Sequence, residues 1–197
     1  MLTDKQKIEN VLSLFLNWNI GDVRKAAHLL PNSWESMDRD KITKIYPTYD
    51  GGAMVGAVIL AMCVIQSVSQ FSKREEQFKW FVNKYLKSYN SGYDGNKIYA
   101  LRCSLIKNYA LITRTSEEGK KNLNPIIAPF ALTDNGPHFE KSKYGTLFNI
   151  REFVIHIQLG IQAFFVEVVT KQLPKDYSER IIKYHDTMKI GPINSSE

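Results

Sequence analysis

The chain is organised around the stretch NKIYALRCSLIKNYALIT, residues 96–113. Its apolar residues recur at helical spacing, yet it also carries the cations Arg102 and Lys107. A charged side chain within an apolar helix costs free energy unless it is paired or used. The stretch therefore predicts a helix whose cations are either paired inside the fold or serve a function. In the first case, Arg102 would pair with Asp94 or Glu152, and Lys107 would extend its stem towards solvent.

Two more apolar stretches lie on either side of this helix in the sequence. Residues 53–65 form an uncharged run, and residues 147–171 are apolar around most of a helical circumference. Both patterns predict buried helices at the centre of a bundle, lying beside each other. The first run is too short to span a bilayer, so we expect no membrane segment there.

These elements predict an all-α fold, a single bundle of five to seven helices with a small irregular or hairpin excursion over residues 109–146. Within the excursion, residues 126–133 contain Pro129, which is confined to the edges of sheets. We therefore expect a short edge strand that pairs with residues 109–113 in a hairpin.

The 197 residues fit one domain, residues 1–197. At the N-terminus, residues 3–6 have the form of a capping box and predict a helix over residues 4–17. Gly21 is expected to begin a second, short helix over residues 23–30.

Charge is unevenly distributed along the chain. Residues 73–121 hold eleven Lys and Arg against five Asp and Glu, so the whole formal excess of six positive charges lies there. A segment this basic suits a polyanion. A solvated, lysine-rich surface that keeps the protein soluble would give the same count.

Cysteine usage and short motifs exclude several classes of site. Cys63 and Cys103 lie in separate apolar runs without a second cysteine or a histidine at metal-binding spacing. The sequence has no phosphate-binding glycine loop and no His/Asp/Glu cluster with metal spacing. We therefore expect no cofactor and no metal. With no apolar signal core at the N-terminus, we expect a cytoplasmic location.

Four features in order resemble a known family. They are Gly-Gly at 51–52 opening the apolar helix, FVNKY at 81–85, YDG at 93–95 and YALRCSLIKNY at 99–109. This order resembles the HEPN superfamily of small α-helical bundles, over about residues 50–172. In that family an arginine is followed, about five residues on, by a histidine. Arg102 matches the arginine, and Lys107 stands where the histidine is expected.

The substitution by Lys107 bears on the chemistry that the resemblance implies. In nucleases of the family, the histidine handles the 2′-hydroxyl proton of RNA and the arginine stabilises charge on the phosphate, without a metal. A lysine has an ordinary pKa of about 10.4 and stays protonated at neutral pH, so it is a poor base. The resemblance thus implies a non-catalytic, HEPN-like module. It would bind RNA, a nucleotide or an acidic partner through a basic groove made by Arg102, Lys107, Asn108 and Tyr109.

The resemblance also implies a homodimer, because the groove of this family often lies at a dimer interface. Two other functions stay open. One is a metal-independent endoribonuclease that uses the unusual lysine, in a setting of prokaryotic defence. The other is a structural or partner-binding helical protein.

Two of the four histidines bear on the site. His138 lies in a loop, from which it could supply the missing acid or base group. His156 lies in the long apolar stretch and is interpreted as a hydrogen-bonded core histidine.

Overall fold

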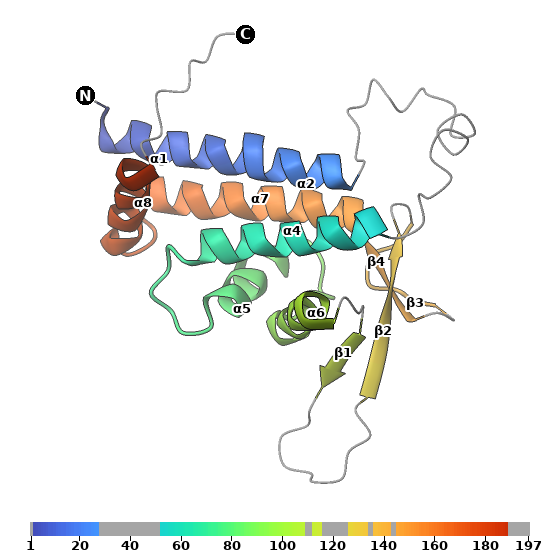
Figure 1. Ribbon diagram of the computed structural model, residues 1–197. Helices are drawn as coiled ribbons and strands as arrows, with labels where there is room; N and C mark the ends of the chain where they lie inside the picture. Colours follow the sequence, from blue (N-terminus) through green and yellow to red (C-terminus); the bar gives the residue numbers. More distant parts are fainter. Residues whose placement is uncertain are drawn as a thin grey trace.

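The elements that position the site are six continuous helical segments and one small sheet (Figure 1). The computed structural model describes residues 2–27, 52–108, 112–115, 126–133, 136–142 and 145–188. The helices form the predicted bundle, and the sheet lies at one end of it (Figure 1).

The first helix runs without a break through α1 (Asp4–Ser13), the π-helical segment η1 (Leu14–Asn19) and α2 (Ile20–Ala26). Its start is the predicted capping box: the Thr3 hydroxyl accepts the N–H of Gln6, and the Gln6 side chain accepts the N–H of Thr3.

The predicted break before a second helix is wrong over residues 17–26. The wider π turn inserts a residue without ending the helix, and Phe15, Ile20 and Val23 all stay buried. Gly21 faces open space, where a helix tolerates it. Residues 28–30 lie outside the described part of the chain.

Two apolar helices form the centre of the bundle, α4 (Gly52–Ser69) and α7 (Ile150–Val169). They lie beside each other, and α1 packs against α7 while α2 contacts both α4 and α7 (Figure 1). Both helices have inward sides with no exposed surface, at Ala57, Val58, Ala61, Met62, Ile65, Phe153, Ile157, Ile161 and Phe164. The prediction of two central helices is confirmed.

Length and composition would allow α7 to cross a membrane. Half of its apolar window is buried inside the protein, and the core helix of a soluble protein meets the same criterion. Its packing against α4 and α1 is that of a core helix.

Three outer segments complete the described bundle: α5 (Gln77–Phe81) continued by the π-helical η3 (Val82–Leu86), α6 (Gly95–Asn108) and α8 (Lys175–Met188). Gly160 of α7 allows η3 to approach closely, because a Cβ there would lie 2.9 Å from Leu86 Cδ2. Asp94 caps α6, since its Oδ1 accepts the backbone N–H groups of Asn96 and Lys97 at 2.9 and 3.0 Å.

The excursion folds as a four-stranded sheet in the order β1-β2-β4-β3. Its strands are β1 (Ile112–Thr115), β2 (Ile126–Thr133), β3 (Lys141–Ser142) and β4 (Gly145–Asn149). β2 pairs antiparallel with β1 and parallel with β4. The antiparallel hairpin was predicted with residues 109–113 as the partner; the paired residues are 112–115, and residues 109–111 lie outside the described part of the chain. The excursion is therefore more ordered than an irregular loop or a single hairpin.

The prediction that residues 126–133 form an edge strand is wrong, because β2 lies between β1 and β4. Its two halves use different neighbours: residues 126–129 pair with β1, and residues 130–133 pair with β4. Pro129 falls in the half that pairs with β1 alone, where its missing N–H does not interrupt a second ladder. The pairing with β4 also moves the start of α7 from the predicted residue 147 to Ile150.

Candidate functional site

Arg102, at the centre of the predicted groove, lies half-buried on α6 against two aromatic rings. Its guanidinium carbon is 5.7 Å from the centre of the Phe78 ring and 5.9 Å from that of Tyr99. Lys107 and Asn108 are the last two residues of α6. Their side chains, and all of Tyr109, lie outside the described part of the structure.

The two carboxylates considered as ion-pair partners of Arg102 are engaged elsewhere. Asp94 caps α6, and Glu152 Oε2 lies 3.4 Å from Nε2 of His156. Nε of Arg102 is buried and has no hydrogen-bond partner among the residues that the structure describes. Within this part of the chain, the neighbours of the guanidinium are rings rather than carboxylates.

A cavity of about 370 Å³, here called the α5–α6 cavity, opens beside these rings. Phe78 and Tyr99 line it together with the cations Arg74 and Lys79. Lys79 Nζ lies 5.4 Å from the centre of the Tyr99 ring and pairs with Glu76. Cations over aromatic faces are therefore the recurring arrangement on this side of the molecule.

Sequence reasoning missed Arg74, Lys79 and Tyr99 as members of this site. Arg74 and Lys79 belong to the excess of positive charge over residues 73–121. That excess indicates a basic segment but does not tell which of its cations lie on the same face of the fold. Tyr99 was hidden in an apolar run, yet its side chain is 38% exposed.

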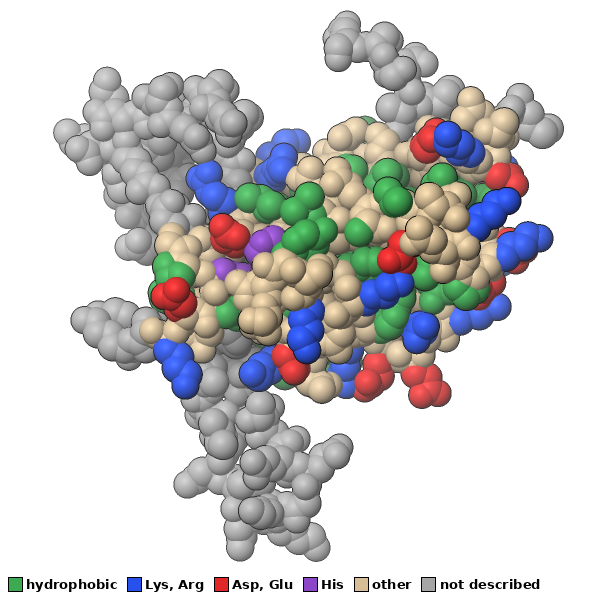
Figure 2. All heavy atoms as spheres, turned by 180° about the vertical axis from the view of Figure 1, so that it is seen from behind, with side chains coloured by type: hydrophobic (Ala, Val, Ile, Leu, Met, Phe, Trp, Pro, Cys, Tyr) green, Lys and Arg blue, Asp and Glu red, His purple; other side chains and the backbone are tan. Residues whose placement is uncertain are grey.

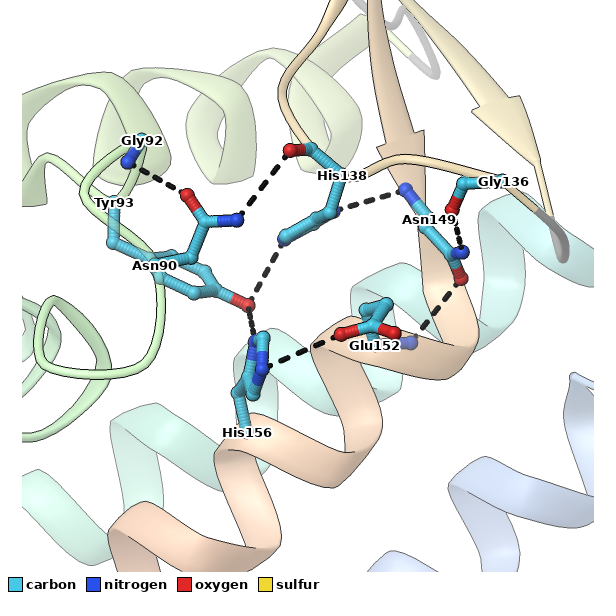
Figure 3. Close-up of polar contacts among 8 residues, drawn as sticks. All are labelled: Asn90, Gly92, Tyr93, Gly136, His138, Asn149, Glu152 and His156. Atoms are coloured by element: carbon cyan, nitrogen blue, oxygen red, sulfur yellow. Dashed lines mark hydrogen bonds and ion pairs between the residues drawn. The ribbon is translucent and has the colours of Figure 1, made fainter.

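His138 occupies a different place, a buried polar network between the sheet and the bundle (Figure 3). Its Nδ1 accepts the backbone N–H of Asn149 at 3.0 Å. In the neutral ring the proton is therefore on Nε2, which donates to the hydroxyl of Tyr93 at 3.0 Å. None of the described contacts of His138 is with Arg102.

From Tyr93 the hydrogen bonds continue through His156 to Glu152 at the surface, each donated in the same direction. Because the Tyr93 oxygen accepts from His138, its own O–H donates to Nδ1 of His156 at 3.0 Å. Nε2 of His156 then carries the proton and points to Glu152, whose side chain is 48% exposed (Figure 3). His156 is thus the hydrogen-bonded histidine that the sequence predicted.

Two asparagines attach this network to three segments of the chain. Asn149 caps α7 through the N–H of Glu152 and donates from its side chain to the carbonyl of Gly136 at 2.6 Å. Asn90 donates to the carbonyl of His138 and accepts the N–H of Gly92. The network therefore joins the turn before α6, the segment before β3 and the start of α7 (Figure 3).

Burial keeps all three titrating rings of this network neutral at neutral pH. It lowers the pKa of His138 from 6.5 to about 3, with a smaller contribution from the nearby His156. Burial also lowers the pKa of His156, against the opposing effect of Glu152. The pKa of the Tyr93 phenol is raised well above 10, by burial and then by Glu152.

This arrangement is suited to holding the fold together rather than to reacting with a substrate. Tyr93 has no exposed surface, and both ring nitrogens of His138 are used inside the protein. No group of three or more His, Cys, Asp or Glu that could hold a metal occurs among the described residues.

Comparison with known protein families, with curated proteins and with solved structures found no match to this chain.

Proposed function

We propose that the protein is a HEPN-like, non-catalytic module that binds RNA or a nucleotide through the basic face of α5 and α6. The observation that supports this best is the environment of Arg102. Its guanidinium lies over Phe78 and Tyr99 and has no carboxylate partner in the described part of the chain. A cation left without a counter-ion beside a partly exposed ring can still receive a phosphate.

The neighbouring α5–α6 cavity adds to this proposal. Arg74 and Lys79 line it and bring two more positive charges close to Tyr99. Cations interleaved with aromatic rings suit single-stranded nucleic acid, because phosphates meet the charges and bases stack on the rings. Glu76 competes for Lys79, so binding would require Lys79 to exchange a carboxylate for a phosphate.

The proposed site is non-catalytic because it lacks a base. Lys107 replaces the histidine of the family pattern and, when protonated, cannot take the proton of a 2′-hydroxyl. His138 does not compensate, because it is buried and committed to Asn149 and Tyr93. Lys107, Asn108 and Tyr109 then act as binding residues, and the module works as a cytoplasmic homodimer.

A titration of the purified protein with a fluorescent single-stranded RNA tests this proposal. Binding should weaken steeply between 50 and 200 mM salt, because phosphate contacts release counter-ions. Arg102→Ala should lose about tenfold in affinity and reduce the salt slope by about one. Lys175→Ala is the matched control, since it removes an exposed cation from α8 and should change little.

Three outcomes would count against the proposal. The first is no binding of RNA or of a competing mononucleotide at low salt, and the second is an equal loss of affinity in Arg102→Ala and Lys175→Ala. RNA that is shortened during incubation in EDTA would instead favour the endoribonuclease.

A further inference from the structure

A second cavity, of about 570 Å³ and here called the α1–α8 cavity, opens where α1, α8 and the end of α7 meet. These three elements come together at the end of the bundle away from the sheet (Figure 1). At this end of the molecule, away from the visible histidines, Figure 2 shows Lys and Arg side chains around hydrophobic ones, with acidic side chains among them. The volume of the cavity lies within the range of small-molecule sites.

The apolar part of the cavity wall is aliphatic. It is made by Ile8, Val168, Val169, Leu173, Pro174 and Ile182. Among the described residues that line this cavity there is no aromatic ring, whereas Phe78 and Tyr99 line the α5–α6 cavity. Such a wall suits a saturated hydrocarbon chain, because it offers no flat ring on which a base could stack.

Three lysines and one aspartate supply the charge at the cavity. Lys5 lies 3.7 Å from the carboxylate of Glu9. Lys175 lies 3.4 Å from that of Glu179. Lys171 is exposed and has no ion pair with any residue that the structure describes. One unpaired cation beside aliphatic walls matches a ligand whose head carries a single negative charge, such as a carboxylate.

The backbone of Lys171 has a conformation that costs free energy for a lysine. This residue follows Thr170, the C-cap of α7, and its φ of 58° lies in the left-handed region where glycine is the usual residue. Its N–H donates to the carbonyl of Val168, and the N–H of Gln172 donates to that of Glu167. Glycine would make the same two hydrogen bonds without the steric cost, so the helix does not need the lysine side chain to end. What the lysine adds is a cation at the cavity.

The neighbouring helix end favours an anion as well. α8 begins at Lys175, so the positive end of its dipole lies at the cavity. At the end of α7, by contrast, the carbonyls of Glu167 and Val168 already accept N–H groups of the following residues. The positive helix end therefore adds to the attraction of Lys171 for a carboxylate.

We propose that the α1–α8 cavity binds a small amphiphilic carboxylate, with its aliphatic chain against the apolar wall and its carboxylate on Lys171. The chain gains free energy by leaving water, and the carboxylate accepts a charge-assisted hydrogen bond from the ammonium group. This site lies beyond the proposed function. It shares no residue with the α5–α6 cavity, so either ligand can bind without the other.

Isothermal titration calorimetry with three probes tests the chemistry of the site. Octanoate should bind as one molecule per chain, with a dissociation constant on the order of 100 µM. The neutral 1-octanol should bind about tenfold more weakly, because it has no charge for Lys171. Acetate, which has the head without the chain, should show no measurable binding. No binding of octanoate, or equal affinity for octanoate and 1-octanol, would overturn the proposal.

The variant Lys171→Gly tests the location of the site. It removes the ammonium group and also the backbone cost, so the variant should be at least as stable as the native chain to urea. It should nevertheless bind octanoate about tenfold more weakly, with unchanged affinity for 1-octanol.

Lys87→Gly is the matched control for the charge. Lys87 is an exposed cation at the end of η3 with an ordinary φ of −60°, and it lines neither of the two named cavities. This variant should keep the native affinity for octanoate, even though glycine lowers its stability slightly. Native octanoate affinity in Lys171→Gly, or an equal loss in Lys87→Gly, would contradict the proposed site.

Discussion

Arg102 on α6 and the Tyr93–His138–His156 network beside α7 are two polar places in the bundle, and they differ in one respect. In the network, both nitrogens of each histidine and the tyrosine hydroxyl have polar partners. Arg102 has a buried Nε without a hydrogen-bond partner in the described chain. Buried polar groups that have all their hydrogen-bond partners stabilise a fold and make it specific. A partly exposed cation without a counter-ion remains available to a ligand. Mutations at the network should therefore change stability, and mutations at Arg102 should change binding.

The largest effect on stability is expected for His138→Ala. It leaves a cavity and removes the partners of Asn149 N–H and the Tyr93 hydroxyl, so the free energy of unfolding should fall by about 3 kcal/mol. Urea denaturation followed by circular dichroism measures this. Lys175→Ala, at an exposed position, should stay within about 0.5 kcal/mol of the native chain. A loss of the same small size at His138 would mean that the network does not hold the fold.

A pH dependence of stability follows from the lowered pKa of His138. Below pH 6.5 the unfolded chain takes up a proton at this ring, while the native state stays neutral down to about pH 3. The stabilisation is therefore complete above pH 6.5 and is lost as pH falls, by about 2 kcal/mol between pH 7 and pH 5. Denaturant unfolding across this range should show the loss, and His138→Gln should flatten it. An unchanged slope in His138→Gln would assign the dependence to other groups.

A smaller loss is expected for Tyr93→Phe. This change keeps the ring packing and removes only the hydroxyl, so Nε2 of His138 and Nδ1 of His156 lose their shared partner. We expect about 1–2 kcal/mol of destabilisation by thermal or urea unfolding. Tyr89→Phe is the control, because Tyr89 is 40% exposed and stacks on His156 with its ring. Equal losses in the two variants would show that the hydroxyl at Tyr93 has no special role.

Local patterns made much of the bundle predictable. Apolar periodicity located α4 and α7, and the residues of the capping box located the start of α1. The start of α7 was also encoded, since Asn149 stands three residues before Glu152, which is the spacing of an N-cap and its acidic partner. The boundary was placed three residues early because the apolar pattern of β4 runs directly into that of the helix.

Contacts between distant residues made the rest unpredictable. The parallel pairing of β2 with β4 and the meeting of Tyr93, His138 and His156 join segments that no local pattern relates. A histidine in a loop next to Pro137 gives no sign that it is buried. The π turn in the first helix was also unpredictable. The residues around it favour a helix whether or not one residue is inserted, so their helix propensity does not mark the insertion.

The face around Arg102 is expected to bind RNA, and the Tyr93–His138–His156 network is expected to stabilise the fold. The most direct test is the RNA affinity of Arg102→Ala and Tyr93→Phe, measured side by side by fluorescence anisotropy at 50 mM salt and at a temperature where both variants are folded. Arg102→Ala should bind about tenfold more weakly than the native chain, and Tyr93→Phe should bind as the native chain does. Native affinity in Arg102→Ala, or an equal loss in Tyr93→Phe, would contradict the claim.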